Sequence, residues 1–172
     1  ATTATGGGSG KPWTVCVAGM ASDGPVIASI AGGVSQDSAG NTNAASTSSD
    51  FSFTYAATGQ TDTLALRDAL AVSTNASPVV FDVVFSEAVT GFAAANVTLA
   101  GTAGATTATV SGSGTAWTVS VSGMTTDGTV IASIAAGVSQ DSAGNTNAAS
   151  TSSDNSVTYD TTGPTVTIEQ GP

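Results

Sequence analysis

The sixteen residues SQDSAGNTNAASTSSD at positions 139–154 also occur, without a single change, at positions 35–50. The two copies lie 104 residues apart, which is the difference between the positions of Asp141 and Asp37, and the similarity extends from residues 1–55 to residues 105–159. Self-similarity at a fixed spacing is the sequence signature of a repeat protein. A repeat of this length is also in the usual size range of one domain.

The repeat predicts three parts in the chain of 172 residues. Residues 1–57 correspond to the C-terminal half of one repeat, and residues 58–160 form a complete repeat. Residues 161–172 are expected to be a linker and the first strand of a further repeat. We therefore expect the chain to be a section of a longer array of domains.

Short segments of alternating apolar and polar residues predict strands in both copies. The clearest is residues 79–85, where the four residues Val79, Phe81, Val83 and Phe85 would face one way and Asp82 the other. Further strands are expected at residues 13–17, 26–30, 51–55, 61–66, 97–99, 107–110, 117–121, 129–134, 155–159 and 165–168. Roughly seven short strands per repeat predict an all-β fold of tandem Ig-like antiparallel β-sandwiches.

Two local features need separate interpretation. Asp23-Gly24 and Asp127-Gly128 favour type I′ hairpin turns, in which both central residues have positive φ. Residues 61–66 could instead form one helical turn continuing towards Leu70, but the β-branched residues at 165–168, in the equivalent position, favour a strand.

Composition and charge restrict the partners. Apolar residues make up 40% of the chain, which is enough for a core, whereas charged residues make up only 8%. With two basic and twelve acidic residues, the net charge of -10 would repel both nucleic acid and anionic lipid. No run of about eighteen apolar residues is present, so this segment is not expected to insert into a membrane.

The chain also lacks the residues that most catalytic sites need. It has no histidine, and Lys11 and Arg67 are its only basic residues. Catalytic triads, metal-hydrolase sites and phosphate clamps would each miss a member. A glycosidase would need two carboxylates about 5–10 Å apart in a cleft, and neither copy offers a distinctive pair. We therefore predict that the protein is not an enzyme.

Four motifs resemble one known family. FSEAVTGF at 85–92, NVTL at 96–99, DSAGN at 141–145 and VTYDTTGP at 157–164 together resemble the bacterial Ig-like repeat domains of S-layer-type proteins and large repetitive adhesins. The resemblance covers residues from about 61 to 160 and the half-repeat before them. It implies a secreted or cell-surface location and stacked domains that act as stalk, spacer or lattice.

The first copy departs from the second in its linker, where Ala56-Ala57 replaces Asp160-Thr161. The half-repeat at 1–57 also lacks counterparts of the strands at 79–85 and 97–99, so it would expose an apolar face and open strand edges. The chain could extend upstream, the fragment could be the ordered part of a larger object, or another subunit could supply the missing strands.

These observations predict a structural and adhesive extracellular repeat protein. Its domains would lie end to end in a stalk, a surface layer or a self-assembling filament, with β-strand complementation between subunits. The alternative is an adhesin module that recognises a glycan or a host protein through its loops.

The repeated DSAGN motif contains the candidate metal ligands Asp37, Asn41, Asp141 and Asn145, whose oxygens suit calcium. Each copy of the motif has one carboxylate, and the acidic spacing of an EF-hand is missing. The alternative is an Asx turn, in which the aspartate side chain accepts nearby backbone N–H groups and a glycine is left-handed. The Asx turn is the preferred interpretation, and no cofactor is required by it.

Cys16 is the single cysteine, which excludes an intrachain disulfide. Its counterpart in the second copy is Ser120, so the position is expected to face solvent. Cys16 could join two chains through an intermolecular disulfide or could be an inert substitution.

Overall fold

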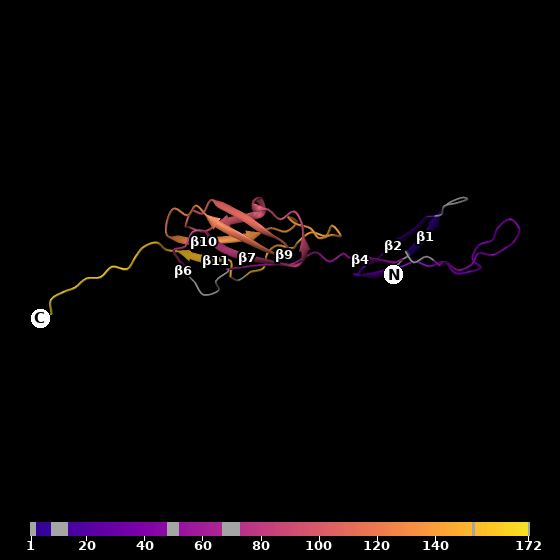
Figure 1. Ribbon diagram of the computed structural model, residues 1–172, viewed down its shortest axis with the longest axis horizontal. Helices are drawn as coiled ribbons and strands as arrows, with labels where there is room; N and C mark the ends of the chain where they lie inside the picture. Colours follow the sequence, from indigo (N-terminus) through magenta and orange to yellow (C-terminus); the bar gives the residue numbers. More distant parts are fainter. Residues whose placement is uncertain (1–2, 8–13, 48–51, 67–72, 153, 172) are drawn as a thin grey trace. The chain divides into compact units, whose positions relative to one another are not determined.

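The computed structural model describes residues 3–7, 14–47, 52–66, 73–152 and 154–171. The chain divides into two compact units, Ala1–Thr58 and Gly59–Pro172. Strands predominate in both (Figure 1), and the one helix among the described residues is the 3-10 helix η1 at Ala94–Asn96. The predicted all-β fold is therefore confirmed. No helix in the described part of the chain has the length and apolar character needed to cross a membrane.

The second unit contains two sheets, and all but one of their strand pairs are antiparallel. The three-stranded sheet has the order β5-β7-β9, formed by Asp62–Leu66, Val79–Val89 and Thr107–Ser122. The four-stranded sheet has the order β6-β11-β10-β8, formed by Ser73–Thr74, Ser156–Tyr159, Gly128–Ile134 and Val97–Ala100. The pairing of β6 with β11 is parallel.

One hydrophobic core joins these two sheets. On β7 the alternation predicted from sequence is confirmed, because Val79, Phe81, Val83 and Phe85 are all buried. The core continues through residues of both sheets: Leu64, Val119, Val121, Val130, Ala132, Ile134 and Val157. Since both sheets contribute to one buried cluster, they pack as the two layers of a β-sandwich. Each fully buried side chain of this kind contributes about 1.5–3 kcal/mol.

The first unit contains two separate antiparallel pairs. Strand β1 (Thr3–Gly7) pairs with β2 (Thr14–Ala18), and β3 (Gly24–Ile27) pairs with β4 (Ser52–Tyr55). The β3–β4 register, from Gly24 opposite Tyr55 to Ile27 opposite Ser52, is the register that β10 and β11 have 104 residues later. Local pairing in the first unit therefore follows that of the second.

Two expected elements differ from the structure. Asp23-Gly24 and Asp127-Gly128 are not type I′ turns, because no described residue other than glycine has positive φ. In each case the glycine begins a strand, β3 or β10, and β10 lies in a different sheet from β9, so no tight hairpin joins them. Residues 165–168 form no strand, because no strand in the described part of the chain pairs with them. The expectations for Trp13, Phe51 and Leu70 lie outside the described residues.

Candidate functional site

Asp141 organises the repeated loop of the second unit. Its Oδ1 accepts the backbone N–H groups of Ala143 and Asn145 at 2.8 and 2.9 Å, and its Oδ2 accepts the side-chain amide of Asn145 at 2.9 Å. Gly144 supplies the left-handed conformation, with φ +87°. The hydrogen bond from the Asn145 side chain is the main reason why the pKa of Asp141 lies below its ordinary value.

Asp37 makes the same turn in the first unit. It accepts the N–H groups of Ala39 and Asn41 and the Asn41 side-chain amide, each at 2.9 Å. The Asn41 amide is the largest cause of its lowered pKa. Asp37 is exposed whereas Asp141 is buried, so one local structure forms in two different surroundings. The predicted Asx turn is present in both copies.

The structure brings the four proposed calcium ligands together as two pairs, Asp37 with Asn41 and Asp141 with Asn145. In each pair the asparagine donates its amide N–H to the carboxylate, so its amide nitrogen rather than its oxygen faces the acid. No group of three or more His, Cys, Asp or Glu side chains gathers anywhere in the described part of the chain. Calcium binding by this loop stays a prediction.

Asn147 holds the two ends of the same loop together through its side-chain hydrogen bonds. Its Oδ1 accepts the N–H groups of Val138 and Ser139, and its Nδ2 donates to the carbonyls of Ala135 and Ala148. Asn43 makes the equivalent four hydrogen bonds in the first unit. Sequence analysis did not assign this role, although the presence of the asparagine in both copies was an available signal.

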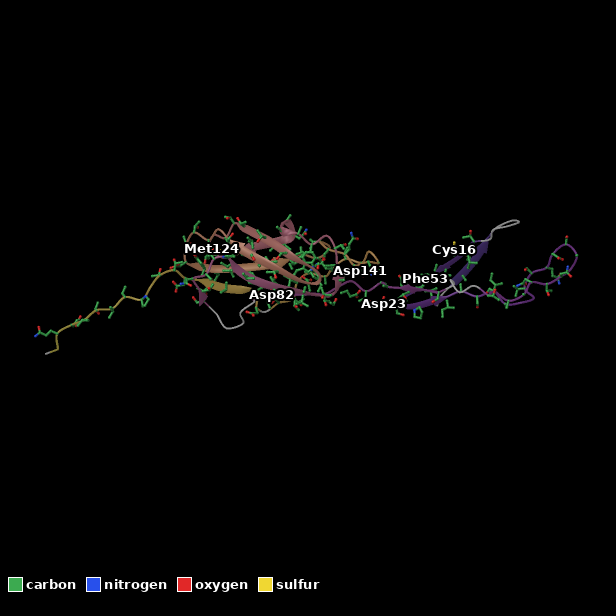
Figure 2. All side chains as sticks on the ribbon, in the orientation of Figure 1. Cys16, Asp23, Phe53, Asp82, Met124 and Asp141 are labelled. Atoms are coloured by element: carbon green, nitrogen blue, oxygen red, sulfur yellow. The ribbon has the colours of Figure 1, made fainter. Side chains whose placement is uncertain are left out.

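Asp127 has a second role that the sequence did not reveal. Its carboxylate accepts the backbone N–H and hydroxyl of Thr161 at 2.8 Å and the hydroxyl of Thr162 at 2.5 Å. In Figure 2, Met124, close to Asp127 in sequence, lies at the end of the second unit from which the C-terminal segment leaves, and Asp141 lies at the other end. The residue expected in a turn therefore fixes the exit of the chain.

The first unit has an open apolar face. We define this open face by the exposed side chains Val15, Ile30, Val34 and Phe53, whose counterparts 104 residues later lie in or against the core of the second unit. Val15 is 49% exposed and Phe53 54% exposed, whereas their counterparts Val119 and Val157 are 0% and 2% exposed. Two hollows of about 670 and 860 Å³ adjoin this face, and Val15 lines both. The open face corresponds to the core side of the second unit.

Cys16 lies in β2 with its side chain exposed and labelled in Figure 2. Its backbone is opposite Thr5 of β1. The predicted exposure is therefore confirmed. Whether the thiol joins two chains is a matter of reactivity, so the intermolecular disulfide stays a prediction.

No protein-family model, no curated protein and no solved structure matches this chain. The likeness to bacterial Ig-like repeats stays an expectation carried by the four sequence motifs. Function is therefore inferred from the residues and from the geometry of the two units.

Proposed function

We propose that the chain is a structural and adhesive repeat protein of the cell surface, in which Ig-like domains placed end to end form a stalk, surface layer or filament. The observation that carries this proposal is the open face of the first unit. Its side chains occupy positions whose counterparts in the second unit lie in or against the core, yet in the first unit they are exposed. Exposed apolar faces of this kind mark interaction surfaces.

The second unit indicates what would cover the open face. There β7 lies against β9, with Val79 opposite Val121, Phe81 opposite Val119 and Asp82 opposite Thr118. The residues of β2 that correspond to this part of β9 are Thr14–Ala18. A strand with the alternating pattern of β7, supplied by another repeat, would therefore pair with β2 and place its apolar residues on the open face. This is β-strand complementation, in which backbone hydrogen bonds give affinity and alternate side chains give specificity.

The energetic argument follows from burial. Covering a side chain such as Phe53 or Ile30 contributes about 1.5–3 kcal/mol, and the open face has several of them. The unpaired backbone groups at the edge of β2 would gain partners in the same step. The sequence provides no histidine and only two basic residues, which favours a structural role over a catalytic one.

Peptide complementation tests this proposal. A peptide with the sequence of residues 79–89, carrying terminal lysines for solubility, is titrated into the full chain. We expect slower amide hydrogen exchange at Val15 and Val17. We also expect the peptide to elute together with the chain in size-exclusion chromatography. The control peptide carries Phe81→Asp and Val83→Asp, which keep the backbone but remove the apolar face.

Two results would count against the proposal. One is equal exchange protection with both peptides. The other is a chain that stays a monomer without any peptide response and binds a glycan or a protein saturably through its second unit, which would support the adhesin-module alternative.

A further inference from the structure

Strand β9 folds back on itself at one side of the three-stranded sheet. The backbone N–H of Thr106, just before the strand, donates to the carbonyl of Ser122 at its end, with a distance of 3.1 Å. Residues 116–121, in the second half of β9, pair with β7. Residues 107–111, in the first half, therefore form the outermost part of this sheet, and we call them the outer arm.

The outer arm has a free edge. In an extended antiparallel strand, successive residues direct their N–H and C=O groups to opposite sides. Because Thr106 donates into the hairpin, the backbone groups of residues 107, 109 and 111 point away from it. In the described part of the chain, no residue outside the hairpin forms a backbone hydrogen bond with these three. Such a row of unpaired groups is a template for a further strand.

The other sheet edges of the second unit are short or blocked. Strand β6 has two residues and β8 has four. Strand β5 carries the buried carboxylate of Asp62, and its Ala65 forms a bridge with Asp154. Short strands, inward-pointing charges and covering segments are ordinary ways of preventing edge pairing. The outer arm has none of them, since it contains neither proline nor a charged residue.

The distribution of charge also favours contact at this edge. The chain has a net charge of -10, which opposes the approach of a second copy. Between Glu87 and Asp127, however, the sequence contains no charged residue at all. Two outer arms can therefore pair without placing like charges directly opposite each other.

The outer arm is complementary to a second copy of itself. In an antiparallel pair centred on Thr109, this residue lies opposite its own copy, Thr107 lies opposite Ser111, and Ala108 lies opposite Val110. The three hydroxyl residues then meet on one face of the sheet. Ala108 and Val110, which are half-buried and pack against the core, meet on the other. In this register all the outward N–H and C=O groups of the arm gain partners.

The first unit lacks an equivalent edge, although β1 (Thr3–Gly7) occupies the corresponding position. Gly6 and Gly7 stand there in place of Val110 and Ser111. Glycine weakens a strand and offers no side chain for packing. The occupant that fits the outer arm is therefore a second outer arm, not the first unit of another chain.

We propose that two copies of the chain associate side by side through the outer arms of their second units. The arms pair antiparallel about a two-fold axis at Thr109, so that one sheet continues from one copy into the next. The interface is small, and small interfaces give weak association. In an array of repeats several weak contacts act together and hold neighbouring chains in register. This lateral role rests on the proposed function, whereas the pairing itself does not depend on the open face of the first unit.

Sedimentation equilibrium and NMR hydrogen exchange of the full chain, both in reductant, test the pairing. We expect the fraction of dimer to rise with protein concentration. Amide exchange at Thr107, Thr109 and Ser111 should slow as the dimer forms, because their N–H groups gain acceptors. Ala108 and Val110 should exchange slowly at every concentration, because their N–H groups point into the hairpin.

Thr109→Lys places two like charges opposite each other at the centre of the pair. We expect it to raise the dissociation constant of the dimer about fivefold or more. The lysine also makes the chain less negative, so a general effect of net charge would strengthen association instead. Thr158→Lys is the matched control, because it makes the same change at an exposed position of β11 in the other sheet, and it should not weaken the dimer.

Three results would overturn the proposal. The first is a chain that stays monomeric at every concentration. The second is equal weakening by Thr109→Lys and Thr158→Lys, or weakening by neither. The third is concentration-dependent protection at Val15 of β2 without protection of the outer arm, which would show association through the open face instead. The exchange pattern of the unmodified chain needs no variant, so it decides the matter even if Thr109→Lys does not fold. Both variants should keep their response to the β7 peptide, which separates this test from that of the proposed function.

Discussion

The carboxylate of Asp127 and the hydroxyl of Thr162 are hydrogen-bonded although 35 residues separate them. The first unit has the same contact between Asp23 and Thr58, with the same separation. In the second unit the contact joins the loop before β10 to the segment after β11, and it therefore fixes where the chain leaves the sandwich. The same aspartate–threonine contact therefore occurs at the C-terminal end of each unit.

Removing this contact should loosen the exit segment. In Asp127→Ala we expect faster amide exchange at Thr161, because the acceptor of its backbone N–H is lost, and a lower melting temperature of the second unit. Hydrogen exchange read by NMR checks the first effect, and calorimetry the second. Glu169→Ala removes the same charge from the exposed C-terminal segment and should change neither; an equal effect of both variants would mean that net charge, not the contact, is responsible.

The lowered pKa of Asp141 predicts acid sensitivity of the repeated loop. Because the folded state holds this carboxyl below its ordinary value of 3.8, the stabilisation is complete above that value and is lost as the pH falls through the lowered folded pKa. Urea unfolding between pH 7 and pH 3 should therefore show a smaller loss of stability in Asp141→Asn than in the unmodified chain. If the free energy of unfolding fell equally with pH in the two proteins, the acid sensitivity would not come from Asp141.

Asp62 should have the opposite dependence, because burial raises its pKa. Its folded pKa is raised, so its protonated form favours folding; that contribution is present at low pH and is lost as the pH rises through the raised value. The gain in stability from Asp62→Val should therefore be larger at pH 7 than at pH 4. The difference between the two proteins is measured by urea unfolding, and a gain that does not vary with pH would refute the raised pKa.

Gly101 allows close approach of β8 to β10. Its φ is +106°, and a methyl group there would meet the carbonyl oxygen of Thr129. We expect Gly101→Ala to destabilise the second unit by about 1–3 kcal/mol more than Gly114→Ala. Gly114 also has positive φ but has open space around it, so the pair separates steric clash from backbone strain. Chemical denaturation gives both values, and equal losses would exclude the clash.

Phe53 and Val157 occupy equivalent positions with different burial. Val157→Ala should cost about 1–3 kcal/mol, because it leaves a cavity in the core. Phe53→Ala should change the stability of the free chain by no more than about 0.5 kcal/mol, as for other exposed sites, yet it should weaken binding of the β7 peptide. Denaturation and peptide titration measure these effects; an unchanged peptide affinity would remove Phe53 from the proposed interface.

Several elements could be predicted because their information is local. The alternation in β7 identified its buried residues, and the motif at Asp141 predicted its turn. The contact between Asp127 and Thr162 was not predicted, because the two residues lie 35 positions apart. The pair Asp127-Gly128 was instead interpreted as a tight turn. The strand expected at residues 165–168 did not form, since a strand needs a neighbour and not only β-branched residues.

The sequence by itself determined the repeated loop. Asp37 and Asp141, and likewise Asn43 and Asn147, make the same hydrogen bonds whether the loop is exposed or buried, because each donor and acceptor lie at most 12 residues apart in the chain. Only the tertiary structure decided which of two equivalent apolar residues is buried. Val15 and Val119 have nearly the same neighbours in sequence, yet one is 49% exposed and the other 0%, because Val119 lies in a core to which both sheets of the second unit contribute.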